Sequence, residues 1–130
     1  MMRCIAVDDE KLVLDLLVDN IQKVPFLQLA GRCRNAMEAA ELLHQESIDL
    51  IFLDIQMPGM DGLELTRRLR ALSGDDIVLI AMTGREPRSG DVTDAFALVD
   101  HCLHKPFDIA KLEQVLPPLS SFQSQRQEPA

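Results

Sequence analysis

The sequence is short of several features that define large classes of protein. No apolar run reaches the roughly 18 residues of a membrane-spanning helix, so we predict that the chain does not enter a membrane. Residues 1–7 lead directly into the charged Asp8 and Asp9, which does not match a secretory signal peptide. Only 13 lysines and arginines stand against 21 aspartates and glutamates, for a formal net charge of −8. Because contact with nucleic-acid phosphates needs a basic face, we predict no direct nucleic-acid binding by this domain.

Cysteine is scarce as well, and its pattern does not indicate a cysteine-bound metal site or a disulfide framework. The three cysteines, Cys4, Cys33 and Cys102, each lie in a strand-like stretch, and their number is odd. They show no metal-ligand spacing, and the three histidines form no cluster with a metal-binding pattern. Small buried thiols in a reducing compartment are the simplest interpretation. Together with the absence of a signal-peptide pattern, this predicts a cytoplasmic protein.

What the sequence does contain predicts one compact α/β domain. Its 130 residues and 47% hydrophobic content are enough for a real core. Short apolar runs alternate with amphipathic stretches, a pattern typical of βα units and a parallel sheet. Predicted strands occupy residues 3–7, 27–33, 50–54, 77–82 and 101–104. Predicted helices occupy residues 11–24, 37–45, 63–72, 92–99 and 109–116, of which the fourth is short and weakly patterned.

Two of the predicted helices carry further signals in the sequence. Asn35 precedes the second predicted helix and is its expected N-cap. In the first helix, five apolar side chains recur at helical spacing. These are Leu12, Leu16, Leu17, Ile21 and Val24. Residues 120–130 are rich in serine, glutamine and glutamate, so we predict a domain over residues 1–119 followed by a flexible tail or the start of a linker.

Polar side chains follow four of the predicted strands, at the points where those strands end. Asp8 and Asp9 follow the first strand, and Asp54 ends the third. Thr83 follows the fourth strand and Lys105 follows the fifth. Ligands of parallel α/β sheets bind outside the carboxyl ends of the strands. The sequence therefore predicts a functional site at this edge of the sheet.

The chemistry of these groups favours a hard cation beside a phosphate. Converging carboxylates repel one another unless a cation holds them, and Mg²⁺ needs only one or two protein carboxylates together with phosphate oxygens. A backbone carbonyl in the loop after Asp54, that of Gln56, is a candidate ligand. Lys105 can pair with a carboxylate or a phosphate as a point charge. Plainer interpretations exist for each group: the acidic pair as the start of a helix, Thr83 as a turn residue, and Lys105 as a surface lysine.

Over residues 3–119 the sequence resembles a response-regulator receiver domain of bacterial two-component signalling. The matching segments, each in its expected order after its expected strand, are Val7-Asp8-Asp9-Glu10, Leu53-Asp54-Ile55-Gln56-Met57-Pro58, Thr83 and Lys105-Pro106-Phe107. The resemblance implies a flavodoxin-like fold, which is a doubly wound sheet of five parallel strands with helices on both faces. It also implies the strand order 2-1-3-4-5.

The same resemblance implies a role for the acidic residues. Asp54 would accept a phosphoryl group from the phosphohistidine of a sensor histidine kinase or of a phosphotransfer protein. Mg²⁺ would be held by Asp9, Asp54 and the backbone carbonyl of Gln56, with Asp8 close by. The domain would support its own phosphotransfer and dephosphorylation without being a multiple-turnover enzyme.

The remaining two site residues would act on the transferred group and pass on the signal. Lys105 would offset its negative charge, and the Thr83 hydroxyl would bond one of its oxygens and pull the loop that follows. The signal would go to an output domain or a partner protein, or would drive a phosphorylation-dependent homodimer. A finer resemblance, to the receivers of LytTR-type regulators, rests on Pro25-Phe26-Leu27-Gln28-Leu29-Ala30-Gly31, on the segment around Asp54 and on Ala95-Phe96.

One position departs from the family pattern and keeps two alternatives open. Receivers usually carry tyrosine or phenylalanine three residues before the conserved lysine, where this chain has Cys102. That difference leaves open a phosphorylation-independent interaction domain with the same fold. A small Mg²⁺-dependent phosphatase of the haloacid dehalogenase type also uses an aspartate nucleophile at a strand end. That class needs a second aspartate two residues later as an acid and base, and here that position is Gln56.

Overall fold

The computed structural model describes residues 2–55, 62–73, 77–83, 99–105 and 107–116. Four predictions lie outside these residues. They concern the helix at residues 92–99, except for its last residue, the backbone carbonyl of Gln56, the loop that follows Thr83, and the tail at residues 120–130.

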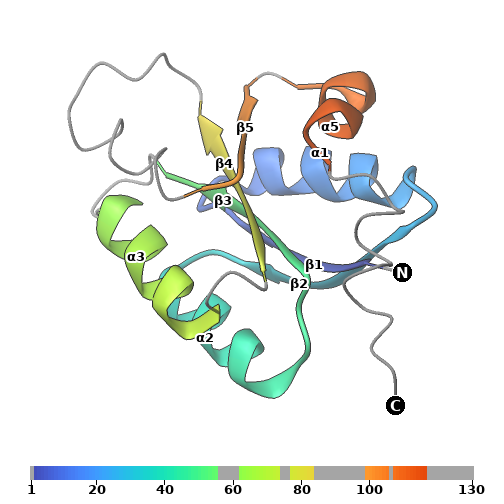
Figure 1. Ribbon diagram of the computed structural model, residues 1–130. Coiled ribbons are helices and arrows are strands. Elements are labelled where there is room, and N and C mark those ends of the chain that lie inside the picture. The colour runs from blue at the N-terminus through green and yellow to red at the C-terminus, as the bar shows by residue number, and fades with distance from the viewer. Residues whose placement is uncertain (1, 56–61, 74–76, 84–98, 106, 117–130) are drawn as a thin grey trace.

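Five parallel strands form one open sheet (Figure 1). The strands are β1 (Met2–Val7), β2 (Leu27–Cys33), β3 (Leu50–Asp54), β4 (Val78–Thr83) and β5 (His101–His104). Their order across the sheet is β2-β1-β3-β4-β5, and every neighbouring pair is parallel. The predicted fold class and strand order are therefore confirmed, and each predicted strand is found to within one residue at either end.

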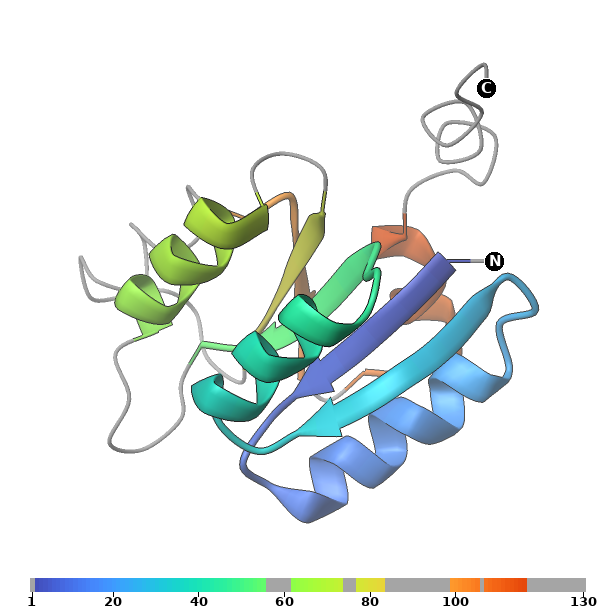
Figure 2. The ribbon, with the colours of Figure 1, turned by 90° about the horizontal axis from the view of Figure 1, so that it is seen from below.

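Helices cover both faces of the sheet (Figures 1 and 2). The helices α1 (Lys11–Gln22) and α5 (Ile109–Val115) lie on one face, and α2 (Ala36–Gln45) and α3 (Gly62–Ser73) lie on the other. Among the helices of the described ranges, none is both long and apolar enough to cross a membrane.

The two faces of the sheet bury two separate hydrophobic cores. Successive side chains of a strand point to opposite faces, so Cys4 and Ala6 join the core under α1 and α5, while Ile5 and Val7 join the core under α2 and α3. The residues of β3 are all buried. Covered on both faces, such a strand reads as a continuous apolar run, and this is why the sheet was predictable from the sequence.

The apolar residues that recur at helical spacing in α1 do not all lie on its buried face. Leu12 is 83% exposed and Leu16 is 45% exposed, whereas Leu14 and Leu17 are buried. Leucines occur on both sides of this helix, so spacing alone admits two apolar stripes. The stripe that packs on the sheet is the one that continues through Ile21.

The first helix also ends two residues earlier than predicted. The backbone N–H groups of Lys23 and Val24 donate to carbonyls three residues back, at 3.1 Å each, which tightens the last turn. Val24 precedes Pro25, whose ring disfavours the helical conformation of the residue before it. The N-cap prediction is confirmed, because the Asn35 side chain accepts a hydrogen bond from the backbone N–H of Glu38 at 2.9 Å.

The three cysteines lie in or beside the two hydrophobic cores. Cys4 and Cys33 are buried and all three thiols are free. Burial raises the pKa of Cys4 to about 12. Burial, assisted by the charge of Glu38, raises the pKa of Cys33 to about 11. Cys102 is half-buried, and burial raises the pKa of its thiol as well.

Candidate phosphoacceptor site

The carboxyl ends of four strands place the predicted site residues at one edge of the sheet. Asp8 directly follows β1, and its backbone N–H continues the pairing with β2 by donating to the Cys33 carbonyl at 3.0 Å. Asp54 is the last residue of β3, and Thr83 is the last residue of β4. The backbone N–H of Lys105 donates to the Thr83 carbonyl at 2.7 Å, so the ladder between β4 and β5 extends to this lysine.

Lys105 joins two buried carboxylates. Its ammonium lies 2.9 Å from Asp8 Oδ2 and 3.4 Å from Asp54 Oδ2. The side chains of Asp8 and Asp54 are 0% and 3% exposed, and that of Lys105 is 17% exposed. The other oxygen of Asp8 accepts a hydrogen bond from the Glu10 backbone N–H at 2.9 Å. The lysine is therefore bonded to Asp8 and stands within ion-pair distance of Asp54.

Burial and the two neighbouring carboxylates have opposite effects on the pKa of Lys105. Burial by itself lowers the pKa, but the hydrogen bond to Asp8 and the negative charges of Asp54 and Asp8 outweigh it. The pKa of Lys105 therefore ends above its ordinary value of 10.5. Because the pKa of Lys105 is raised in the folded state, its charged ammonium stabilises the fold. This stabilisation is complete at pH values below the ordinary pKa and is lost as the pH rises through the raised pKa.

Among the described residues of the site, Asp9 has incomplete hydrogen bonding. One of its carboxylate oxygens, Oδ1, is buried and has no hydrogen-bond partner. A buried, unsatisfied carboxylate oxygen is costly, so its position needs a compensating group. Carboxylate oxygens of Asp8, Asp9 and Glu10 lie within 4.8 Å of one another. This acidic cluster includes Glu10, an exposed residue that the sequence had not singled out as a ligand.

The donor set fits a hard divalent cation. With Asp8, Asp9 and Asp54 ionised and Lys105 protonated, three negative charges and one positive charge leave a formal charge of −2. All the side-chain donors are oxygens, which is the ligand type that Mg²⁺ takes. The unsatisfied Asp9 oxygen supplies a free ligand atom beside this charge.

Thr83 is 0% exposed and lies on the strand next to β3. Its carbonyl accepts a hydrogen bond from the backbone N–H of Lys105, so a backbone hydrogen bond links the two residues. The structure thus brings together Asp8, Asp54 and Lys105 by direct contact, with Asp9 and Thr83 on adjoining strand ends. Gln56 lies outside the described residues.

Lys105→Ala is expected to lower the free energy of unfolding by about 3 kcal/mol, because removing one partner of a buried ion pair leaves uncompensated buried charge. Urea unfolding followed by circular dichroism, in a chelating buffer near neutral pH, measures this. The matched control is Lys23→Ala, which removes an exposed lysine and should change the free energy by less than about 0.5 kcal/mol. Equal stabilities of the two variants would contradict the assigned ion pairs.

A family model and curated relatives match this chain. The model of the response regulator receiver domain matches residues 4–117. Response regulator MprA of Mycobacterium leprae is 35% identical over 112 residues, covering 85% of this chain and 47% of that protein. An uncharacterized response regulatory protein of Shewanella oneidensis is 33% identical over 116 residues, covering 89% of this chain and 48% of that protein. The chain thus spans about half the length of these relatives.

Solved structures match the fold over nearly the whole chain. A CheY-like receiver domain from Methylobacillus flagellatus has a TM-score of 0.78 at 25% identity, covering 94% of this chain and 98% of its own. The signal receiver domain of an HD domain-containing protein from Pseudomonas fluorescens Pf-5 has a TM-score of 0.78 at 25% identity, covering 98% of each chain.

Proposed function

This chain belongs to the response regulator receiver family, whose members are phosphorylation-dependent switches of two-component signalling, and we propose that Asp54 is its phosphoacceptor. The observation that carries the proposal is the position of the Asp54 carboxylate. It is buried at the end of β3, 3.4 Å from the Lys105 ammonium and at the same edge of the sheet as the acidic cluster. The donor would be the phosphohistidine of a sensor histidine kinase or of a phosphotransfer protein.

The transfer is a displacement at phosphorus. An oxygen of Asp54 attacks the phosphoryl group, the new O–P bond forms as the N–P bond of the phosphohistidine breaks, and the histidine nitrogen leaves. The product on Asp54 is an acyl phosphate. Positioning and charge stabilisation do most of the catalytic work in such transfers. Lys105 contributes to charge stabilisation, because Asp8 holds its ammonium within reach of Asp54.

The acidic residues would hold the metal ion. Asp9, Asp54 and the backbone carbonyl of Gln56 are the proposed ligands of Mg²⁺, with Asp8 beside them. Mg²⁺ in this place would offset the negative charge of the phosphoryl oxygens. The unsatisfied Asp9 oxygen supports this assignment.

Thr83 would read the phosphorylated state. Its hydroxyl would donate to an oxygen of the acyl phosphate, and a shift of Thr83 would pass to β5 through the bond between its carbonyl and the Lys105 N–H. The usual aromatic residue is replaced by the half-buried Cys102, so no aromatic side chain can report this shift from that position.

The output of the switch lies with other proteins or other segments. The relatives are about twice as long as this chain, which supports a proposal that the signal passes to an output domain or a partner protein. A phosphorylation-dependent homodimer is a further proposed output. The domain would act in the cytoplasm and return to its resting state by hydrolysis of its own acyl phosphate. The finer resemblance to LytTR-type regulators stays a prediction.

Incubation with acetyl phosphate tests this proposal against its two alternatives. In the presence of Mg²⁺ the protein should gain one phosphoryl group, seen by intact mass spectrometry, and a chelator should prevent the gain. A phosphorylation-independent domain would gain none under either condition. Sustained release of phosphate from a panel of phosphomonoesters would instead identify a phosphatase of the haloacid dehalogenase type.

A further inference from the structure

The strand β5, which directly precedes Lys105, has one fully buried side chain. This strand has four residues and is the last strand of the described sheet, where it pairs with β4. Of its side chains, Leu103 is buried and Cys102 is half-buried, while His101 and His104 are exposed. Within the described residues, Leu103, which is buried in the core under α1 and α5, is thus the main side chain of β5 whose packing resists sliding along β4.

The site cannot tolerate such sliding. The Lys105 ammonium is 2.9 Å from Asp8, a normal hydrogen-bond distance. A slip of one residue moves a strand by about 3.3 Å and turns every side chain to the opposite face. Either change would break the contacts of Lys105 with Asp8 and Asp54. Contacts that add to the pairing with β4 and to the packing of Leu103 would therefore help to fix the register of β5.

Asp100, which directly precedes β5, makes contacts of this kind. Its backbone N–H donates to the Leu79 carbonyl at 2.8 Å. Its carboxylate oxygen Oδ2 accepts from the Leu79 backbone N–H at 2.9 Å. Both polar backbone groups of Leu79 are thus bonded to the same residue, one position before the regular pairing begins at Ile80 and His101.

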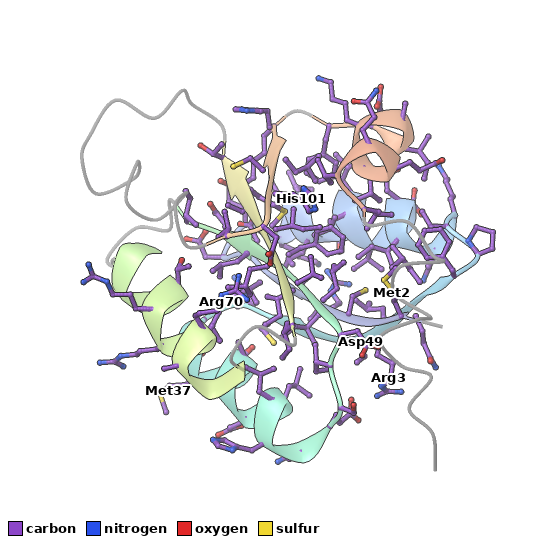
Figure 3. The ribbon with its side chains drawn as sticks, viewed as in Figure 1. Met2, Arg3, Met37, Asp49, Arg70 and His101 are labelled. Atoms are coloured by element: carbon purple, nitrogen blue, oxygen red, sulfur yellow. The ribbon has the colours of Figure 1, made fainter. Side chains whose placement is uncertain are left out.

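Arg70 holds this carboxylate in place. It reaches from α3 towards the strands (Figure 3), and its Nη2 donates to Asp100 Oδ2 at 3.0 Å. Its Nη1 donates to the Ile77 carbonyl at 2.8 Å, just before β4. The arginine side chain is 19% exposed, and the neighbouring Leu69 anchors the helix in the core. One guanidinium therefore ties α3 to the beginnings of both β4 and β5.

We infer that Arg70 and Asp100 are positioning residues for phosphoryl transfer, which set the register of β5 and thereby hold the Lys105 ammonium at Asp8 and Asp54. This inference rests on the proposed role of Asp54. The pair secures one end of β5, and the bond from the Lys105 N–H to the Thr83 carbonyl secures the other. With cysteine at position 102, the strand lacks the packing that an aromatic side chain would add there.

Asp100→Ala tests the inference at the strand itself. Amide hydrogen exchange followed by nuclear magnetic resonance should show at least about tenfold lower protection of the Lys105 N–H. Asp100→Asn keeps an oxygen for the Leu79 N–H and should have a smaller effect. The matched control is Asp15→Ala, which breaks the exposed ion pair between Asp15 and Arg32 on α1 and β2 and should leave this amide unchanged.

Phosphorylation rates separate positioning from a general loss of structure. With acetyl phosphate and Mg²⁺, Asp100→Ala should be phosphorylated about tenfold more slowly than the wild type, since misplacement of a catalytic group is costly. In a Lys105→Ala background the same substitution should cost no more than about twofold, because the residue through which it acts is already gone. Arg70→Gln should follow Asp100→Ala in both backgrounds.

Each outcome has a definite meaning. A wild-type rate for Asp100→Ala, or an equal loss with and without Lys105, overturns the positioning role. If the wild type takes up no phosphoryl group, the proposed function of Asp54 fails. Hydrogen exchange then decides the inference separately, and unchanged protection of the Lys105 N–H in Asp100→Ala overturns it.

Discussion

Asp54→Asn is expected to abolish phosphoryl uptake from acetyl phosphate. The amide is a poor nucleophile and cannot form a stable acyl phosphate, although its size matches the carboxylate that it replaces. The fold should be kept, since Asn retains an oxygen near the Lys105 ammonium and relieves part of the charge repulsion with Asp8. Intact mass spectrometry after incubation with the donor and Mg²⁺ measures the phosphorylated fraction.

The chain offers a matched control in the same strand region. Asp49 is also a buried aspartate, with 5% exposure. It precedes the first residue of β3, at the end of the strand opposite to Asp54, and lies next to Arg3 (Figure 3). Its Oδ2 accepts a hydrogen bond from the Arg3 backbone N–H at 2.8 Å, a bond that asparagine can also accept. Asp49→Asn should therefore be phosphorylated like the wild type. Equal uptake by Asp54→Asn and Asp49→Asn would rule out Asp54 as the acceptor.

Asp9→Ala is expected to weaken Mg²⁺ binding by about 100-fold. The substitution removes a buried carboxylate oxygen that has no hydrogen-bond partner among the described residues. It also removes a unit of negative charge from the group formed by Asp8, Asp9, Asp54 and Lys105, whose formal charge is −2. Mutation of a group that orients the ligands of a metal ion typically lowers the metal affinity 10- to 100-fold. Loss of a charged ligand itself is expected to lie at about the upper end of that range. Isothermal titration calorimetry is suited to the measurement, because the chain has no tryptophan or tyrosine for intrinsic fluorescence.

Glu10→Gln is the control for this titration. Glu10 is exposed and belongs to the same acidic cluster, but it follows the pair at the start of α1. Its loss should change the affinity by less than about threefold, as expected for an exposed charge that is screened by solvent. A titration curve for Asp9→Ala that matches the wild type would exclude Asp9 as a ligand. A large loss for Glu10→Gln would move the metal site outwards along the helix start.

The parts of the fold that follow from alternating burial were predictable from the sequence. The residues of β3 and β4 are nearly all buried, and a strand covered on both faces has to be apolar throughout. The polar residues that end these strands were also predictable as neighbours, because parallel strands bring their carboxyl ends to one edge. The contacts of Lys105 with Asp8 and Asp54 agree with that expectation.

Features that depend on tertiary packing were not predictable in the same way. Leu12 and Leu14 are equally apolar, and only the docking of α1 on the sheet decides that Leu14 is buried and Leu12 is 83% exposed. Arg70 and Asp100 are 30 residues apart, and each alone reads as an ordinary charged residue. Their pairing depends on where α3 lies relative to the beginning of β5, which no local pattern reports.

The most direct test of the central claim is the location of the phosphoryl group. The protein is incubated with acetyl phosphate and Mg²⁺, the acyl phosphate is reduced with borohydride, and the peptides are sequenced by mass spectrometry. Reduction converts a phosphorylated aspartate to homoserine and so marks the acceptor permanently. The expected result is homoserine at position 54 and at no other aspartate. Homoserine at Asp8 or Asp9, or an unmarked chain that still carries phosphate on a serine, threonine or histidine, would contradict the assignment of Asp54 as the phosphoacceptor.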